Sequence, residues 1–204
     1  MIESEFKHID TENETETHPW EPFIPDGARV LIMGTFPPGP HRWSMDFYYP
    51  NRTNDFWYMM GLIFFGRRDA LLRPGTKDFD LQAIITLLSE KGIAMNDTAR
   101  RVRRLKGNAS DKFLEILEPV PLFDLLAQMP DCHTIATTGE KAARVIADLT
   151  STDVPKMGEM VTSSSGLHIW RMPSTSRAYP LALEKKAAYY ARLFRDAGIS
   201  LPAE

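Results

Sequence analysis

A continuous apolar run, Val30-Leu31-Ile32-Met33, stops abruptly at Gly34 and is followed by Thr-Phe-Pro-Pro. Strands that are buried on both faces have such uninterrupted apolar sequences, whereas a strand with one face in water alternates. Glycine and proline disfavour further strand, so the chain turns into a loop at this point. The run therefore predicts a central strand at residues 29–33 in a mainly parallel sheet, with a loop at its carboxyl end.

The rest of the chain alternates between helix and strand patterns. Apolar residues at helical spacing predict helices at 56–64, 80–91, 110–117, 122–128, 140–149 and 182–197. Short apolar runs predict strands at 93–95, 134–137 and 167–172. Strands that alternate with helices favour a three-layer α/β/α fold, with an open, mainly parallel sheet covered by helices on both faces.

The size of the chain indicates one folded domain. The 204 residues include 43% hydrophobic residues, enough for one substantial core. Residues 1–20 are acidic and polar, and we expect them to form a mobile or loosely docked lead-in without a chemical role. The expected domain therefore covers residues 21–204.

Composition excludes several classes of protein. Cys132 is the only cysteine and the five histidines are scattered, so the sequence has neither a disulfide framework nor a metal-ligand pattern, and we expect no cofactor. The single cysteine fits a reducing cytoplasm, the first residues lack a signal peptide, and no stretch is long enough to span a membrane, so we expect a cytoplasmic protein. We also expect a monomer. The net charge of −3 does not by itself indicate a polyanionic partner.

Three polar loops follow the carboxyl ends of predicted strands. They cover residues 34–54, 96–108 and 173–179. In open α/β sheets the carboxyl ends of the strands line the binding crevice. We therefore expect these loops to meet around one site.

Motifs in these loops resemble the uracil-DNA glycosylase superfamily, and within it the mismatch-specific and hypoxanthine-DNA glycosylase-like branches. The resemblance rests on Gly34-Thr-Phe-Pro-Pro38, on the aromatic and amide-rich segment 48–57, and on Met172-Pro-Ser-Thr-Ser176. With the intervening segments it spans roughly residues 29–195. It implies an enzyme that flips one nucleotide out of duplex DNA and holds its base in a pocket.

The resemblance assigns a base pocket to residues of all three loops. Tyr49 occupies the position at which the family stacks the extruded base; the alternative is a loop aromatic that fills the edge of the core. The carboxamide of Asn96 offers a donor and an acceptor to a base edge. The remaining expected base-binding residues are Gly34, Thr35, Phe36 and Met172.

The catalytic groups differ from the usual pattern of the superfamily. Many members have Asp or Asn within the first motif, but residues 34–38 contain neither. In the hypoxanthine-type branch the important Asn lies in the aromatic segment and matches Asn54, which could instead cap the following helix. Asp97 is the second candidate, with a turn cap as the alternative. Met172 stands where several branches place a histidine donor, so that donor is missing here.

Phosphate contacts are expected from three segments. Hydroxyls and amides of Pro173, Ser174, Thr175 and Ser176 suit phosphate oxygens, although such a sequence is also typical of a turn. The basic run 100–106, with Arg101, Arg103 and Arg104, could neutralise phosphates or simply be a solvated face. Gly139 and Lys141 lie at the start of a predicted helix, where free amides attract anions.

Together these features predict a monofunctional DNA glycosylase that excises uracil, hypoxanthine or a similar base from duplex DNA. The alternative is a glycosylase fold that binds nucleic acid or a nucleobase without cutting, which the missing acid in residues 34–38 and Met172 would favour. An unrelated α/β hydrolase or nucleotide-binding protein is the third possibility.

Overall fold

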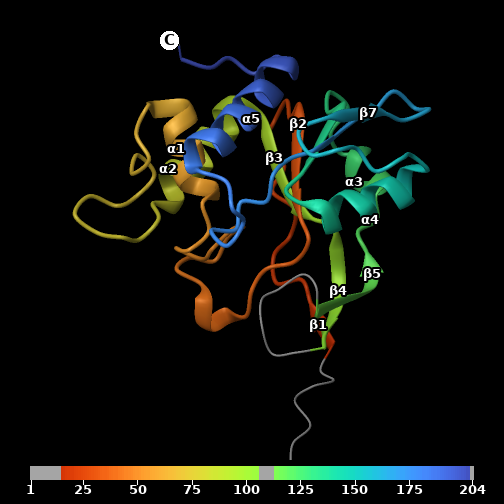
Figure 1. Cartoon of the computed structure of the whole chain (residues 1–204), viewed down its shortest axis with the longest axis horizontal. Coiled ribbons are helices and arrows are strands. Elements are labelled where there is room, and N and C mark those ends of the chain that lie inside the picture. The colour runs from red at the N-terminus through yellow and green to blue at the C-terminus, as the bar shows by residue number, and fades with distance from the viewer. Residues whose placement is uncertain (1–14, 106–112, 203–204) are drawn as a thin grey trace, which may run out of the picture.

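A five-stranded, mainly parallel sheet forms the centre of the protein, for which a computed structural model describes residues 15–105 and 113–202. The strand order is β3-β2-β6-β8-β7 (Figure 1). β2, β3, β6 and β8 are parallel and β7 is antiparallel to β8. Their bounds are β2 (Val30–Gly34), β3 (Ile93–Asp97), β6 (Thr134–Thr137), β7 (Met160–Thr162) and β8 (His168–Arg171).

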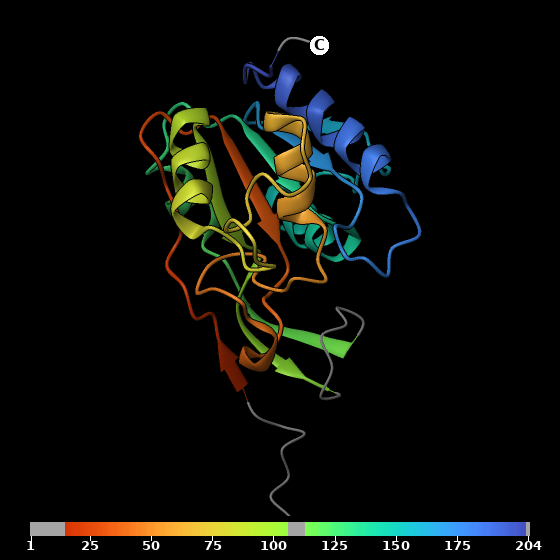
Figure 2. The same ribbon diagram turned by 90° about the vertical axis from the view of Figure 1, so that its left-hand side faces the viewer.

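Helices cover both faces of this sheet, as the alternating pattern predicted (Figure 2). One face packs against α1 (Phe56–Phe65), α2 (Leu81–Lys91) and α5 (Leu183–Asp196). The other packs against α3 (Leu122–Leu126) and α4 (Glu140–Thr150). The apolar run of β2 divides between the two cores, because successive side chains of a strand point to opposite faces. The three-layer α/β/α fold is thereby confirmed.

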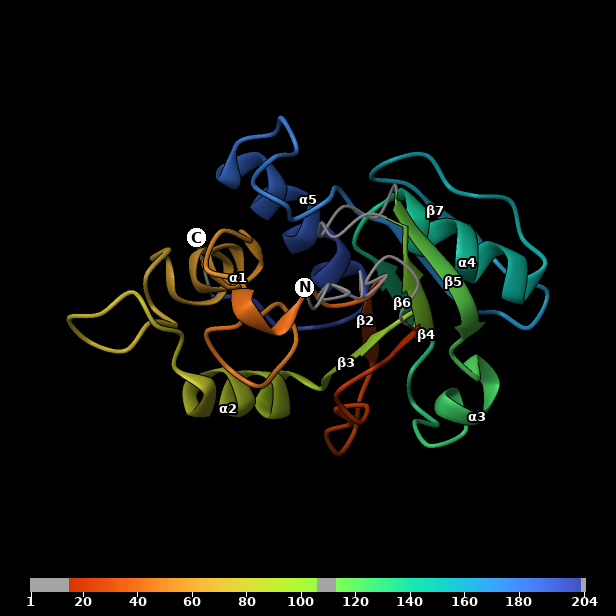
Figure 3. The same ribbon diagram turned by 90° about the horizontal axis from the view of Figure 1, so that it is seen from below.

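A second, antiparallel sheet projects from the carboxyl edge of the central sheet (Figures 1 and 3). It contains β1 (Thr15–Thr17), β4 (Ala99–Arg104) and β5 (Leu114–Pro119) in the order β1-β4-β5. β4 follows β3 with only Thr98 between them, so the chain passes directly from one sheet into the other.

Two predictions for this region were wrong. Residues 99–104 form strand β4, although the whole of 96–108 was expected to be a loop. Residues 114–117 belong to strand β5, although a helix was expected at 110–117. In β5 the buried Leu114 and the half-buried Ile116 alternate with the exposed Glu115 and Leu117, which is the period of a strand. The parts of both predictions at 106–112 lie outside the described residues.

Residues 15–20 make specific contacts with the rest of the fold, although their acidic, polar composition predicted a mobile or loosely docked segment. β1 pairs with β4, and the backbone N–H of His18 donates to the carbonyl of Arg100 at 2.8 Å. The Trp20 ring packs against Trp43 with 4.8 Å between ring centroids. These residues therefore dock on the fold; residues 1–14 of the expected lead-in lie outside the described range.

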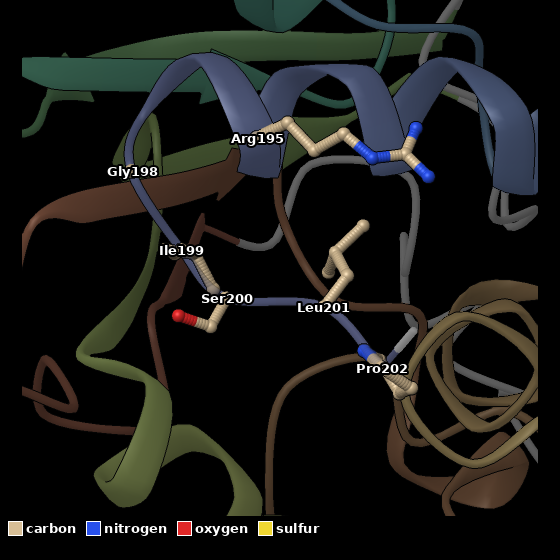
Figure 4. A pocket seen from close by; sticks show the side chains of 6 residues that line it. All are labelled: Arg195, Gly198, Ile199, Ser200, Leu201 and Pro202. Atoms are coloured by element: carbon tan, nitrogen blue, oxygen red, sulfur yellow. The ribbon is translucent and has the colours of Figure 1, made fainter. Parts of the chain in front are cut away.

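The opposite, amino edge of the sheet is closed by the carboxyl-terminal segment. Arg29 donates to the carbonyl of Gly198 at 2.7 Å, and Lys91 donates to the carbonyl of Ser200 at 2.9 Å. A shallow hollow lies between the end of α5 and this segment, where Leu201 points towards the helix and Ser200 points away from it (Figure 4). It has no contact with the loops at the carboxyl edge.

Among the described residues, no helix combines the length and the apolar character that crossing a bilayer requires.

Candidate functional site

A cavity of about 800 Å³ opens at the carboxyl edge of the central sheet. Its walls come from the loops that follow β2 and β8, from Asp97 at the end of β3 and from Thr138 after β6. The lining residues that had been predicted as site residues are Gly34, Thr35, Phe36, Tyr49, Asn54, Asp97, Ser174, Thr175 and Ser176. Two of the predicted loops, 34–54 and 173–179, therefore meet here, and the third predicted segment contributes Asp97, while its residues 99–104 form strand β4.

The register of the parallel strands explains why the cavity forms here. Gly34, the last residue of β2, pairs with Asp97, the last residue of β3. Thr138 follows the end of the neighbouring strand β6, and its backbone N–H donates to the carbonyl of Met33 at 2.9 Å. Three chain segments therefore leave the sheet at one level and surround the same space.

Gly34 allows a carboxylate and a hydroxyl to approach the floor of the cavity. A Cβ atom at this position would lie 2.5 Å from Asp97 Oδ1 and 3.1 Å from the Tyr49 hydroxyl. The first distance is far shorter than a carbon–oxygen contact. Glycine is therefore required by the close approach of these two groups, rather than by the turn that follows the strand.

The other oxygen of Asp97 is held by a residue from the amino-terminal segment. His18 Nε2 lies 3.0 Å from Asp97 Oδ2, and both side chains are only 7% exposed. Burial of the His18 ring lowers its pKa, but the hydrogen bond to Asp97 and the charge of Asp97 outweigh burial, so the pKa is raised above its ordinary value of 6.5. A buried acid and a buried imidazole thus form a pair at the cavity wall.

This pair predicts a pH-dependent stability. A raised folded-state pKa means that the protonated His18 stabilises the fold fully below pH 6.5, its unfolded value, and that this contribution is lost as pH rises through the folded-state pKa. Denaturant unfolding of the wild type and of His18→Gln at about pH 5.5 and about pH 9 measures it. The advantage of the wild type is expected to shrink at the higher pH; an advantage that grows would contradict the prediction.

Tyr49 has the geometry of a stacking platform. Its ring lies nearly parallel to that of Phe56, with 4.0 Å between centroids and 12° between planes. Its hydroxyl lies 2.8 Å from the Thr138 hydroxyl, and its backbone has a positive φ of 52°. Phe56 covers one face of the ring, and Tyr49 lines the cavity.

Asn54 lines the cavity and also contacts the start of a helix. Its Oδ1 accepts a hydrogen bond from the backbone N–H of Phe56, the first residue of α1, at 2.9 Å. The N-cap of α1 is Asp55, so Asn54 precedes the cap and forms an Asx-type turn instead of the expected N-cap. Within the described residues this is the one hydrogen bond that the Asn54 side chain makes, and it uses the oxygen Oδ1. The NH₂ group of the side chain takes no part in it. Asn54 also pairs through its backbone with Ser176, which joins two walls of the cavity.

A buried ion pair fixes the loop that contains Ser174 and Ser176. Lys186 is completely buried and donates to Asp55 Oδ2 at 2.9 Å and to the carbonyl of Ser176 at 2.9 Å. The half-exposed Arg177 contacts the other oxygen of Asp55 at 3.1 Å. The backbone N–H of Asp55 donates to the carbonyl of Thr175 at 2.8 Å. Neither Asp55 nor Lys186 was predicted as a site residue.

Other predicted base-binding residues lie away from the cavity. Asn96 precedes Asp97 on the same strand and so points to the opposite side, where its Oδ1 accepts from the Tyr48 hydroxyl at 3.1 Å. Met172 is 1% exposed and belongs to the apolar core beneath the sheet. Neither side chain lines the space beside Tyr49.

Three predicted phosphate contacts are likewise displaced from the cavity. Pro173 is buried and does not line it. Gly139 does not line it either, although a Cβ atom added to this glycine would lie 3.9 Å from Ser174 Cβ. The ammonium group of Lys141 donates to the carbonyl of Leu114, so it is directed towards β5.

In the described part of the basic run, residues 100–105, glutamates on adjacent strands face the arginines. Arg101 and Arg103 lie 3.7 Å and 3.0 Å from carboxylates of Glu118 and Glu115 on β5. Arg104 makes a bidentate pair with Glu16 and donates to the carbonyl of Pro37 at 2.7 Å. Arg104 thereby supports the cavity wall, and the role of the run in phosphate binding stays a prediction.

The described residues contain no group of three or more His, Cys, Asp or Glu side chains placed to hold a metal ion.

The fold is similar to that of a solved structure. A solution NMR structure of a protein from Methanosarcina acetivorans, provisionally named a uracil DNA glycosylase, matches with a TM-score of 0.63 at 18% sequence identity. The match covers 91% of this chain and 99% of that one. The two chains share one fold. Comparison with protein-family models and with curated proteins finds no match.

Proposed function

We propose that this protein is a DNA glycosylase that extrudes a deaminated or mismatched base, such as uracil or hypoxanthine, and hydrolyses its N-glycosidic bond. The observation that carries the proposal is the placement of the Asp97 carboxylate, the Tyr49 ring and the Asn54 amide on the walls of one cavity. The glycosylase-like fold supports it. The substrate range, which includes the bases handled by the hypoxanthine-type branch, is part of the proposal.

Asp97 is the group best placed to support the sugar as the bond breaks. Cleavage develops positive charge on the sugar, and a carboxylate beside it stabilises that charge. The same carboxylate accepts the proton of the water whose oxygen bonds to the anomeric carbon. Asp97 fits both tasks because one of its oxygens is held by His18 while Oδ1 lies over Gly34, at the floor of the cavity.

The departing base carries negative charge and needs hydrogen-bond donors. Asn54 supplies an amide group, and Thr138 and Tyr49 supply hydroxyls on the same cavity wall. Ser174 and Ser176 also line the cavity, and in this proposal their hydroxyls bind the phosphates beside the extruded nucleotide rather than its base. In this assignment Asn54 stabilises the base rather than the water, because a carboxamide is not a general base.

One observation favours the alternative of a binding protein without activity. Met172 is buried in the core, so the site has no histidine donor at the position where several branches of the superfamily place it. The assay must therefore separate binding from base release.

Duplexes that contain uracil, hypoxanthine, xanthine or a mismatched thymine test the proposal when free base and abasic sites are both measured. We expect release from at least one lesion duplex and none from an undamaged duplex. Asn54→Ala is expected to reduce the rate of base release by a factor of about 10²–10³, because this is the usual effect of removing one hydrogen-bond donor to a developing anion. Asn54→Ser is the matched control, because serine keeps a side-chain oxygen for the turn but has no amide. Binding of every duplex without release from any would contradict the proposal.

Tyr49 gives a second prediction about binding alone. Tyr49→Ala is expected to weaken binding of the lesion duplex by about 1–3 kcal/mol, the usual contribution of one base stacked on an aromatic ring. Tyr49→Phe keeps the ring and should bind like the wild type, apart from the lost bond to Thr138. Fluorescence anisotropy with lesion and undamaged duplexes measures both variants. Equal affinity of Tyr49→Ala and wild type for the lesion duplex would show that Tyr49 only fills the edge of the core.

A further inference from the structure

Within the described residues, His18 of the amino-terminal segment is the one side chain that forms a hydrogen bond with the Asp97 carboxylate. His18 lies 79 residues from Asp97 in sequence, and its Nε2 is 3.0 Å from Asp97 Oδ2. Because a carboxylate carries no proton, Nε2 must carry the hydrogen of this bond. The bond leaves Asp97 Oδ1 directed over Gly34, where the cavity floor lies.

The His18 ring is held so that it donates in either protonation state. Its Nδ1 lies 2.9 Å from the carbonyl of Trp20 and 3.3 Å from the backbone nitrogen of the same residue. The imidazolium can donate to that carbonyl, whereas the neutral ring can accept from that N–H, and Nε2 keeps its proton in both. The ring stacks on Tyr48 at 5.7 Å and 27°, and the edges of Trp20 and Phe36 enclose it.

The surroundings of the ring separate it from the substrate cavity. His18 and Asp97 both line a second cavity of about 500 Å³, on the other side of the pair, whereas Asp97 alone also lines the first. Tyr48 packs on the ring, and Glu21 on the following segment adds a negative charge nearby. The other charged side chains that line the second cavity are those of Arg100 on β4 and Asp124 on α3. His18 can therefore act on a substrate only through Asp97.

We infer that His18 is a positioning residue: it holds the Asp97 carboxylate with one oxygen directed into the substrate cavity. The inference rests on the proposed function for the part that Asp97 plays in the reaction. It gives the docked segment at residues 15–20 a role in assembling the site, through the pairing of β1 with β4. Loss of the donor would leave a buried carboxylate unpartnered and free to turn.

An NMR titration of the His18 ring tests the pairing without any activity. In Asp97→Asn the pKa of His18 is expected to fall, because burial lowers it and the carboxylate that raises it has been removed. His133→Gln, at an exposed histidine, is the control and should leave the titration of His18 unchanged. An unchanged His18 pKa in Asp97→Asn would overturn the inference.

Kinetics with a lesion duplex test the positioning role. His18→Phe keeps an aromatic ring that can pack against Tyr48, Trp20 and Phe36, but it removes the hydrogen-bond donor to Asp97. We expect kcat to fall about 10- to 100-fold, which is the range found when the hydrogen-bond partner of a metal-ligating side chain is removed. KM should be unchanged. His18→Gln restores an N–H donor and should recover part of kcat. Equal kcat in wild type and in both variants would overturn the inference, even if His18→Phe is less stable. If the wild type releases no base, the proposed function fails, and the NMR titration still decides whether His18 and Asp97 are coupled.

Discussion

Asp97→Asn is expected to lose base release by about 10²–10⁴-fold, the usual effect of removing a positioned acid–base group. Asparagine has almost the same shape and can still accept the hydrogen bond from His18 Nε2, so the cavity should be preserved. Binding of the lesion duplex should therefore change much less than the rate. Single-turnover measurements of free base, with the enzyme in excess, report the chemical step directly.

An exposed acid provides the matched control for this variant. Asp131→Asn makes the same chemical change on the surface, between α3 and β6, and should release base at the wild-type rate. Asp97→Asn with a rate close to that of Asp131→Asn would contradict the assignment of Asp97. Asn54 would then be the remaining candidate among the residues that line the cavity.

Asp55→Asn is expected to lower the free energy of unfolding by about 3–5 kcal/mol, because it leaves the fully buried Lys186 without its counter-charge. Lys186 also supports the carbonyl of Ser176, so the loop at the cavity mouth should loosen as well. Denaturant unfolding with a folded-state baseline measures the loss of stability.

Two further variants make this result specific to the buried pair. Asp196→Asn removes an exposed partner of Arg192 on α5 and should change stability by no more than about 0.5 kcal/mol. Replacing the pair together, as Asp55→Asn with Lys186→Met, removes the unpaired charge and should recover part of the loss. A loss in Asp55→Asn no larger than that in Asp196→Asn would show that Lys186 finds another partner.

Local patterns were sufficient to predict the central sheet and one side of the site. The apolar run ending at Gly34 predicted a buried parallel strand, and β2 is completely buried. Because parallel strands end at one level, the positions of Asp97 and Ser174 after their own strands also placed them near Gly34. Tyr49 and Asn54 came from the resemblance of their segment to a family, and both line the same cavity.

Features that depend on long-range pairing were missed. The sequence of the basic run did not show that its arginines pair with Glu115 and Glu118, because these lie on β5, of which residues 114–117 had been predicted as a helix. A hydrophobic pattern of four residues is too short to separate a strand from a helix, which explains that error. Similarly, nothing in an acidic leading segment indicates that His18 will contact Asp97, because the pairing of β1 with β4 brings them together.

The burial of Lys186 illustrates the same limit within a helix that was predicted well. α5 was expected at 182–197 and extends over Leu183–Asp196, but lysine is rarely buried, so its sequence gives no sign that one lysine reaches the core. Its partner Asp55 lies 131 residues away. Such a pair can be found only once α1 and α5 have been placed side by side.

A crystal structure of Asp97→Asn bound to a duplex with one deaminated base tests the central claim most directly. The proposal predicts that the base leaves the duplex, stacks on the Tyr49 ring, and places the anomeric carbon of its sugar beside residue 97. Serines 174 and 176 should then lie at the phosphates on either side. A bound duplex in which every base stays stacked and the cavity beside Tyr49 holds no base would contradict the claim.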